Sequence, residues 1–218
     1  GNGAYADATS GRFTGAHLDF NEFMTLCRAN GSEPVIVVAC DTAREVTGST
    51  TAPTLAELAA SAAAWVKYAN ITKGYGIRYW SIGNESWFRS GMTAAIYAGH
   101  VNQFATAMRA VDPTISIGAH GNSQGWFQTV IQQAAATIDW LDVHDYPTYG
   151  WSSGYDVFRN GSPSLTNGVN DAIAALGVAS ASDQARLTVG VTETGPIDWV
   201  QMSWPNVNDL GHALVTFD

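Results

Sequence analysis

Two apolar stretches of this chain each end in a glutamate. Residues 79–86 (YWSIGNES) predict a buried strand that delivers Asn84 and Glu85 to its carboxyl end, and residues 187–193 (LTVGVTE) predict a second strand that ends in Glu193. Cleavage of a glycosidic bond needs one carboxylic acid that protonates the leaving oxygen and one carboxylate that attacks the sugar or activates water. The pair therefore predicts a two-carboxylate hydrolase, if the fold brings the two strand ends together.

A third predicted strand, residues 138–146, finishes in His144 and Tyr146. Alternate residues of a strand share one face, so these two side chains should point together into the mouth where Glu85 and Glu193 arrive. A tyrosine hydroxyl beside a carboxylate orients the carboxylate and stabilises its ionised form.

Four further residues are candidate substrate contacts. Asn84 precedes Glu85 and could hydrogen-bond a sugar hydroxyl. Trp87 and Trp199 follow the two glutamates on loops, where they could form walls that stack on sugar rings or could simply cover the core. His120 ends another strand, and its position fits a pocket residue and a structural histidine equally well.

Other interpretations of the polar residues remain open. Either glutamate alone could be an unrelated surface carboxylate, but the combination with Asn84 and the His-x-Tyr strand favours catalysis. Asp142, His144 and Asp145 could be metal ligands, yet a metal-dependent hydrolase needs several more ligands at strand ends, and the chain has only 5 His. We therefore expect no metal or other cofactor.

The composition indicates one globular domain over residues 1–218. The chain is 46% hydrophobic and 13% charged, which suffices for one sizeable core. A net charge of −9 and only two lysines argue against a nucleic-acid partner, which needs clustered basic residues, and favour a neutral or weakly charged substrate. No run reaches the roughly 18–20 apolar residues of a membrane span, so no membrane partner is expected.

The composition and the first residues also bear on processing and location. Low lysine content with abundant Ser, Thr, Asn and Gly indicates secretion, and an opening Gly-Asn-Gly in place of Met indicates a processed or trimmed chain. Cys27 and Cys40 could form one disulfide, but two buried free thiols are favoured. The sequence does not predict an oligomeric state.

Helical and strand-like stretches alternate along the chain, which predicts βαβ units and a parallel sheet. A closed (β/α)8 TIM barrel needs eight strands. Five are predicted here, of which residues 34–40 are expected to be buried on both faces, and the fold class is therefore an α/β barrel that is incomplete and lacks a closing wall. The expected strands are 34–40, 77–83, 115–120, 138–146 and 187–193, and the expected helices are 17–30, 54–70, 92–110, 124–137 and 165–176.

The motifs YWSIGNE, HDY and TET, in this order, resemble strands four, six and seven of the retaining glycoside hydrolases of clan A. Within that clan, residues 22–24, 33–38 and 107–113 are most similar to the α-L-arabinofuranosidases. The resemblance implies that Glu85 is the acid/base and Glu193 the nucleophile. It also implies that Asn84 binds the sugar 2-hydroxyl and that His144 and Tyr146 contact the substrate or the nucleophile.

The expected function is cleavage of glycosidic bonds in plant or algal polysaccharides or oligosaccharides by double displacement, in the manner of an α-L-arabinofuranosidase. Two rivals remain open. One is an endo-acting clan A β-glycanase that cuts glucan, xylan or galactan, and the other is a catalytically silent barrel that binds carbohydrate. The retaining mechanism predicts that the carboxyl groups of Glu85 and Glu193 lie about 5–5.5 Å apart.

Overall fold

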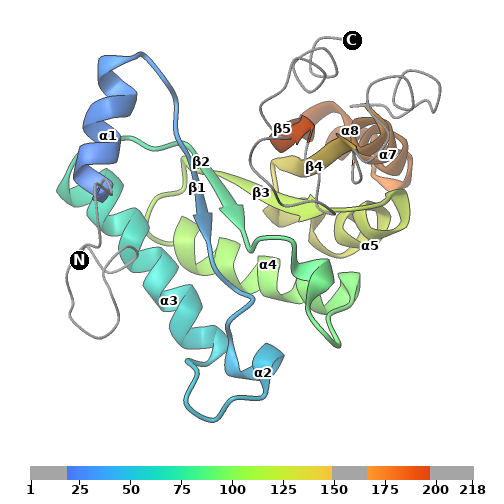
Figure 1. Cartoon of the computed structure of the whole chain (residues 1–218), viewed down its shortest axis with the longest axis horizontal. Coiled ribbons are helices and arrows are strands. Elements are labelled where there is room, and N and C mark those ends of the chain that lie inside the picture. The colour runs from blue at the N-terminus through green and yellow to red at the C-terminus, as the bar shows by residue number, and fades with distance from the viewer. Residues whose placement is uncertain (1–18, 149–165, 197–218) are drawn as a thin grey trace.

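Five parallel strands form one sheet in the computed structural model, which describes residues 19–148 and 166–196 (Figure 1). The order of the strands in the sheet is their order along the chain, and every neighbouring pair is parallel. This confirms the predicted sheet. The strands are β1 (Val35–Val38), β2 (Tyr79–Ile82), β3 (Ser116–Gly121), β4 (Trp140–Thr148) and β5 (Thr188–Pro196).

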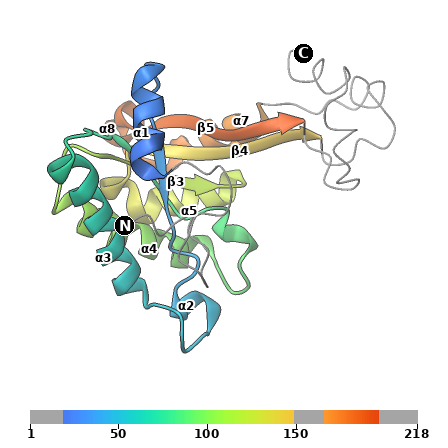
Figure 2. The ribbon, with the colours of Figure 1, turned by 60° about the vertical axis from the view of Figure 1, so that its left-hand side comes forward.

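Helices separate the strands along the chain and pack side by side in chain order: α3 contacts α4, α4 contacts α5, and α5 contacts α7. Figure 2 shows β4 and β5 running next to each other toward the same end. Two short helices, α2 and α8, were not predicted. The α-helices are α1 (Phe20–Ala29), α2 (Arg44–Thr47), α3 (Leu55–Val66), α4 (Ala94–Arg109), α5 (Gln124–Ala134), α7 (Asn167–Ala175) and α8 (Ala181–Arg186).

Single helical turns extend several of these elements. The predicted helix 54–70 continues beyond α3 as a π-helical turn, and the predicted helix 124–137 continues beyond α5 as a 3-10 turn. A further 3-10 turn follows β2, where the candidate acid Glu85 precedes it. These turns are η1 (Lys67–Thr72), η2 (Ser86–Phe88), η3 (Ala135–Thr137) and η4 (Leu176–Val178).

The start of α3 follows from its sequence. Thr54 accepts a hydrogen bond from the backbone N–H of Glu57, and the Glu57 carboxylate accepts one from the backbone N–H of Thr54 at 2.7 Å. This capping box satisfies backbone groups that a helix start leaves unpaired. Asp19 and Glu22 do the same for α1.

The core lies between the sheet and these helices. Trp80 of β2 is fully buried and meets Trp65 of α3 edge to face at 6.0 Å between ring centroids. Ile82, Ile117 and Leu141 continue this buried face on β2, β3 and β4. Apolar burial of this kind is the main force that holds the strand ends, and so the site, in place.

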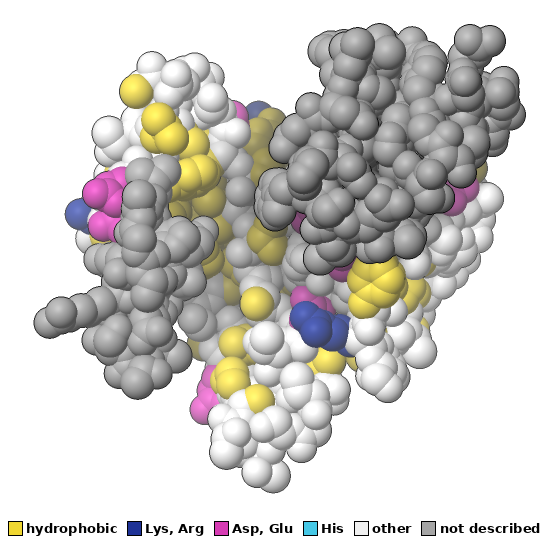
Figure 3. Space-filling model, in the orientation of Figure 1, with side chains coloured by type: hydrophobic (Ala, Val, Ile, Leu, Met, Phe, Trp, Pro, Cys, Tyr) yellow, Lys and Arg dark blue, Asp and Glu magenta, His cyan; other side chains and the backbone are white. Residues whose placement is uncertain are grey.

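The first strand differs from its prediction. Ile36 and Val38 are buried, but Val35 and Val37 are 40% and 44% exposed, so β1 is not buried on both faces. Figure 3 shows apolar side chains gathered over the region of β1. In a closed barrel the inward face packs against opposite strands. The described residues include no such strands, and the inward face of β1 is therefore left open.

The described strands thus form part of a (β/α)8 barrel, and the sheet has β1 and β5 at its two edges. No described helix has the length and apolar character that a membrane crossing requires. Cys27 and Cys40 are both buried free thiols, as predicted. The single-domain assignment of residues 1–218 stays a prediction.

Candidate active site

Glu85 follows β2 in an unusual backbone conformation. Its φ of 50° and ψ of 43° lie in the left-handed region, and it is the single non-glycine residue with a positive φ in the described part of the chain. Such a conformation costs on the order of 1–3 kcal/mol and persists where surrounding structure enforces it, often at functional sites. The turn therefore favours a functional interpretation of Glu85.

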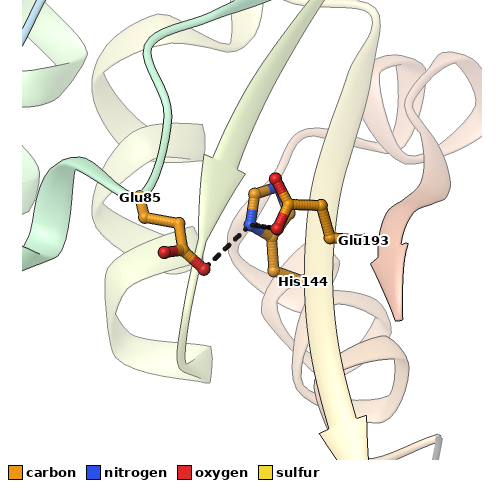
Figure 4. Close-up of side chains that lie close together, drawn as sticks. All are labelled: Glu85, His144 and Glu193. Carbon is orange, nitrogen blue, oxygen red and sulfur yellow. Dashed lines mark hydrogen bonds and ion pairs between the residues drawn. The ribbon is translucent and has the colours of Figure 1, made fainter. Parts of the chain in front are cut away.

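Glu85, His144 and Glu193 converge from three elements, and Figure 4 shows their side chains pointing toward one another. Nδ1 of His144 lies 3.1 Å from Oε1 of Glu85 and 3.5 Å from Oε2 of Glu193. One carboxylate oxygen of each glutamate lies within 4.8 Å of the other. This short spacing agrees with the roughly 5–5.5 Å of retaining enzymes better than with the roughly 6.5–9.5 Å of inverting ones.

Tyr146 completes the surroundings of Glu193. Its hydroxyl donates a hydrogen bond to Oε2 of Glu193 at 2.7 Å, the contact that the sequence predicts. The His144 side chain is only 4% exposed, whereas those of Glu85 and Glu193 are 27% and 38% exposed. The two carboxylates are thus partly accessible to solvent, whereas the imidazole ring between them is buried.

A β-bulge sets the orientation of Glu193. Val143 pairs with Val191, but His144 pairs with Glu193, so Thr192 is an extra residue in β5. The Thr192 hydroxyl donates to Oδ1 of Asp142 at 2.5 Å, while Glu193 reaches His144. Two successive side chains therefore serve the same side of the sheet, which regular alternation would not allow.

Asp142 is a buried carboxylate beneath the site. Besides Thr192, the Ser81 hydroxyl donates to it at 2.5 Å, and burial raises its pKa. Asp145 instead accepts the backbone N–H of Gly168 at 2.7 Å. The metal set considered for Asp142, His144 and Asp145 is therefore not assembled. Among the described residues, the group that could jointly reach a cation is the glutamate pair with His144.

A pocket of about 600 Å³ lies at this end of the sheet. Glu193 is not part of its lining but contacts two lining residues, His144 and Tyr146. The pocket is large enough for a sugar ring and part of a leaving group. It is lined by Glu85, Trp87, Phe88, Gly121, Asn122, His144, Asp145, Tyr146, Asn167, Gly168 and Asp171.

Trp87 lies where the sequence places it, half-buried in the pocket wall. Its ring meets those of His144 and Trp126 edge to face at 5.9 and 6.3 Å. The Asn84 side chain is exposed beside the site, and its backbone N–H donates to Asp41. Trp199 lies outside the described residues.

Of the two interpretations left open for His120, the structure favours the structural one. The residue is fully buried, its Nε2 accepts the backbone N–H of Ser86 at 3.0 Å, and its Nδ1 lies 3.2 Å from the Tyr97 hydroxyl. Burial lowers the pKa of His120 to about 3, so the ring is neutral. With both nitrogens engaged by protein, His120 is a structural histidine.

Sequence reasoning missed three buried polar residues around the Glu85 turn: Asp41, Ser86 and Tyr97. Asp41 was detectable in principle, because it directly follows the apolar stretch 34–40 and so ends a predicted strand. Ser86 and Tyr97 carry no such local signal, since a serine after a turn and a tyrosine in a helix are both common.

Curated relatives with sequence similarity are arabinofuranosidases. A probable α-L-arabinofuranosidase C from Aspergillus fumigatus is 28% identical, over 61% of this chain and 29% of that protein. An intracellular exo-α-L-arabinofuranosidase from Bacteroides ovatus is also 28% identical, over 61% of this chain and 27% of that protein. The chain thus spans less than a third of the length of these relatives.

Solved structures with the same fold carry similar names. A family 51 arabinofuranosidase from Xanthomonas axonopodis pv. citri superposes with a TM-score of 0.66 at 18% identity, over 90% of this chain and 44% of that chain. An α-L-arabinofuranosidase from Thermotoga maritima gives a TM-score of 0.55 at 23% identity, over 80% of this chain and 38% of that chain. These likenesses show the fold, part of a (β/α)8 barrel.

The most extensive sequence match is to a family model. The model described as "Alpha-L-arabinofuranosidase 1 domain" matches residues 6–162, which include β1 to β4 and Glu85 but not Glu193. Because this match covers well over half of the sequence, the chain belongs to the α-L-arabinofuranosidase 1 domain family.

Proposed function

We propose that this chain provides the catalytic glutamates of a retaining α-L-arabinofuranosidase. The single observation that carries the proposal is the meeting of Glu85 and Glu193, with carboxylate oxygens within 4.8 Å of one another, at the carboxyl ends of two parallel strands. Membership in the family indicates that the sugar is an α-L-arabinofuranosyl group. The short distance between the carboxylates supports a mechanism that retains the anomeric configuration.

In the proposed first step, Glu193 attacks the anomeric carbon while Glu85 gives its proton to the departing glycosidic oxygen, so a glycosyl ester forms and the aglycone leaves as an alcohol. In the second step, Glu85 takes a proton from water, and that water displaces Glu193 from the sugar. The hydrogen bond from the Tyr146 hydroxyl holds the Glu193 carboxylate in position for this attack. Nδ1 of His144 lies between the two carboxylates, at hydrogen-bonding distance from Glu85 and 3.5 Å from Glu193, and so helps to position Glu85.

The test begins with the full-length gene product and a set of nitrophenyl glycosides, led by the α-L-arabinofuranoside and the β-xyloside. Glu193→Ala should abolish turnover of every substrate, because no glycosyl ester can form. Glu85→Ala should lose about 10²–10⁴-fold with unactivated leaving groups. It should still react with activated aryl glycosides, whose departure needs no proton, and azide should raise its rate by replacing the water of the second step.

Glu33→Ala is the matched control, because Glu33 is an exposed glutamate before β1, far along the sheet from the site. It should keep full activity. Equal losses for the Glu85 and Glu193 variants on both substrate types, with no azide rescue, would contradict the assigned roles. A first-formed product of inverted configuration would contradict retention.

The two rivals have less support. No specific contact in the described site favours an endo-acting β-glycanase, and the paired carboxylates argue against a barrel that only binds carbohydrate. Plant or algal origin of the glycan and secretion of the protein remain proposals. Release of arabinose from polymeric arabinan and arabinoxylan, and fractionation of the native host, would test them separately.

A further inference from the structure

Below the Glu85 turn lies a buried polar cluster that the proposed mechanism does not use. Asp41, Ser86, Tyr97 and His120, which we call the turn cluster, come from three strand ends and a helix. Asp41 is 4% exposed and the other three are fully buried. Burial of four polar side chains is unfavourable unless each is hydrogen-bonded, and here each is bonded to the others or to the turn.

Asp41 clamps the turn on both sides of Glu85. Its Oδ2 accepts the backbone N–H of Asn84 at 2.8 Å, and its Oδ1 accepts the hydroxyl hydrogen of Ser86. The buried Cys40 thiol also lies 3.6 Å from Oδ1. One carboxylate thus binds the residue before and the residue after the candidate acid.

His120 provides the second clamp. Because its Nε2 accepts the Ser86 backbone N–H, its ring proton must lie on Nδ1, which faces the Tyr97 hydroxyl. That hydroxyl donates to the carbonyl of Ile82 at 2.6 Å and accepts the backbone N–H of His120 at 3.0 Å. The low pKa of His120, about 3, keeps the ring an acceptor at any physiological pH.

The turn is closely packed at Gly83. Gly83 also has a positive φ, of 79°, and a Cβ at this position would lie 2.8 Å from both His120 Cε1 and Ser86 Oγ. Without acceptors for the flanking N–H groups, the strained Glu85 backbone would relax toward ordinary φ values. Its carboxyl group would then move away from its place beside His144.

We propose that Asp41 and His120 are positioning residues that hold Glu85 in its left-handed conformation and thereby aim its carboxyl group at the leaving oxygen. This inference rests on the proposed role of Glu85 as the acid. It assigns a function to a strand-end aspartate and to a histidine that themselves have no access to the substrate.

The predicted signature is a dependence on the leaving group. Asp41→Asn replaces one acceptor oxygen by an NH2 group, which cannot accept a hydrogen bond. The turn therefore loses the hydrogen bond from either the Asn84 N–H or the Ser86 hydroxyl. Because a misplacement of about 1 Å can reduce rates on the order of 10²-fold, kcat/KM for an alkyl α-L-arabinofuranoside should fall about 10- to 100-fold. For a dinitrophenyl glycoside, which needs no acid, kcat/KM should stay within about threefold.

His120→Ala should show the same pattern, and His120→Gln should restore part of the loss, because a glutamine oxygen can accept the Ser86 N–H. Asp139→Asn is the matched control. Asp139 likewise accepts a backbone N–H, that of Ile117 at 2.7 Å, and pairs with Arg109, but it lies at the opposite end of the sheet. Asp139→Asn should change kcat/KM for the alkyl and the dinitrophenyl glycoside by the same factor. Thermal unfolding of each variant gives the folded fraction by which rates are corrected.

Equal losses of Asp41→Asn on both substrates, or no loss on either, would overturn the positioning role, as would failure of His120→Gln to exceed His120→Ala. If His120→Ala does not fold, Asp41→Asn decides alone. Failure of the proposed function is recognised separately, because Glu85→Ala would then show no leaving-group dependence of its own.

Discussion

At the scale of single residues, the site is defined by which atoms hold the carboxylate of Glu193. The Tyr146 hydroxyl donates to this carboxylate directly, and the buried His144 ring lies next to it, so the position of the carboxylate depends on two neighbours from β4. Hydrogen bonds to a charged group contribute about 1.5–3 kcal/mol. Loss of one such donor should therefore be visible in the rate without harm to the fold.

Tyr146→Phe tests the contribution of the hydrogen bond from the Tyr146 hydroxyl to Glu193. It removes the hydroxyl and keeps the ring, and we expect kcat to fall about 10- to 100-fold, the equivalent of about 1.4–2.7 kcal/mol. Steady-state kinetics with the nitrophenyl arabinofuranoside measures it. Tyr68→Phe, which removes a hydroxyl bonded to Asn21 away from the site, should leave kcat unchanged. Similar kinetics for both variants would show that the Tyr146 hydroxyl does not assist the nucleophile.

At the scale of elements, the ends of β1, β2 and β3 act as one unit around the Glu85 turn. Asp41 follows β1, His120 lies on β3, and both bind backbone that follows β2. Parallel strands place such ends together at one edge of the sheet. The conformation of the turn therefore depends on how β1 and β3 pack beside β2.

Gly83→Ala should break this unit. The added methyl group meets His120, Ser86 and Cys40 at 2.8–2.9 Å in a positive-φ conformation, and we expect a loss of several °C in Tm together with loss of activity. Gly99→Ala is the control, because Gly99 lies within α4 with nothing within 4 Å of an added Cβ. That variant should be neutral or stabilised by up to about 1 kcal/mol. Equal Tm values for the two variants would refute the packing argument.

At the scale of the whole molecule, helices cover one face of the described sheet, whereas the other face is left open at β1. Helices cover Ile36 and Val38 of β1, whereas Val35 and Val37 point to the other side and stay exposed. Open apolar strand faces and edges favour association with further polypeptide. The free energy of unfolding of the 218-residue chain therefore depends on whether further residues cover the open face of β1.

Two isosteric substitutions, one on each face of β1, test which face is covered. In the 218-residue chain, Val38→Thr should destabilise by about 1–3 kcal/mol because it buries a hydroxyl, while Val37→Thr on the open face should change stability by less than about 0.5 kcal/mol. Urea unfolding of the two variants gives the comparison. Equal destabilisation would mean that the inner face is covered in solution by residues beyond those described.

The sequence by itself determined the strands, their parallel order and the meeting of Glu85, His144, Tyr146 and Glu193. These follow from local rules: apolar runs form strands, alternate residues share a face, and parallel strands end at one edge. The resemblance to clan A glycoside hydrolases rests on the same strand-end motifs. The similarity to arabinofuranosidases rests on residues 22–24, 33–38 and 107–113, and the family match agrees with it.

Only the tertiary structure decided the burial of His120, the bulge at Thr192, the open face of β1 and the clamp by Asp41. The physical reason is that each depends on partners distant in the chain. The Asp41 and Asn84 that share a hydrogen bond are 43 positions apart, and His120 and Ser86 are 34 apart. Burial and hydrogen bonding over such separations depend on how strands pack, and no local pattern of residue types records them.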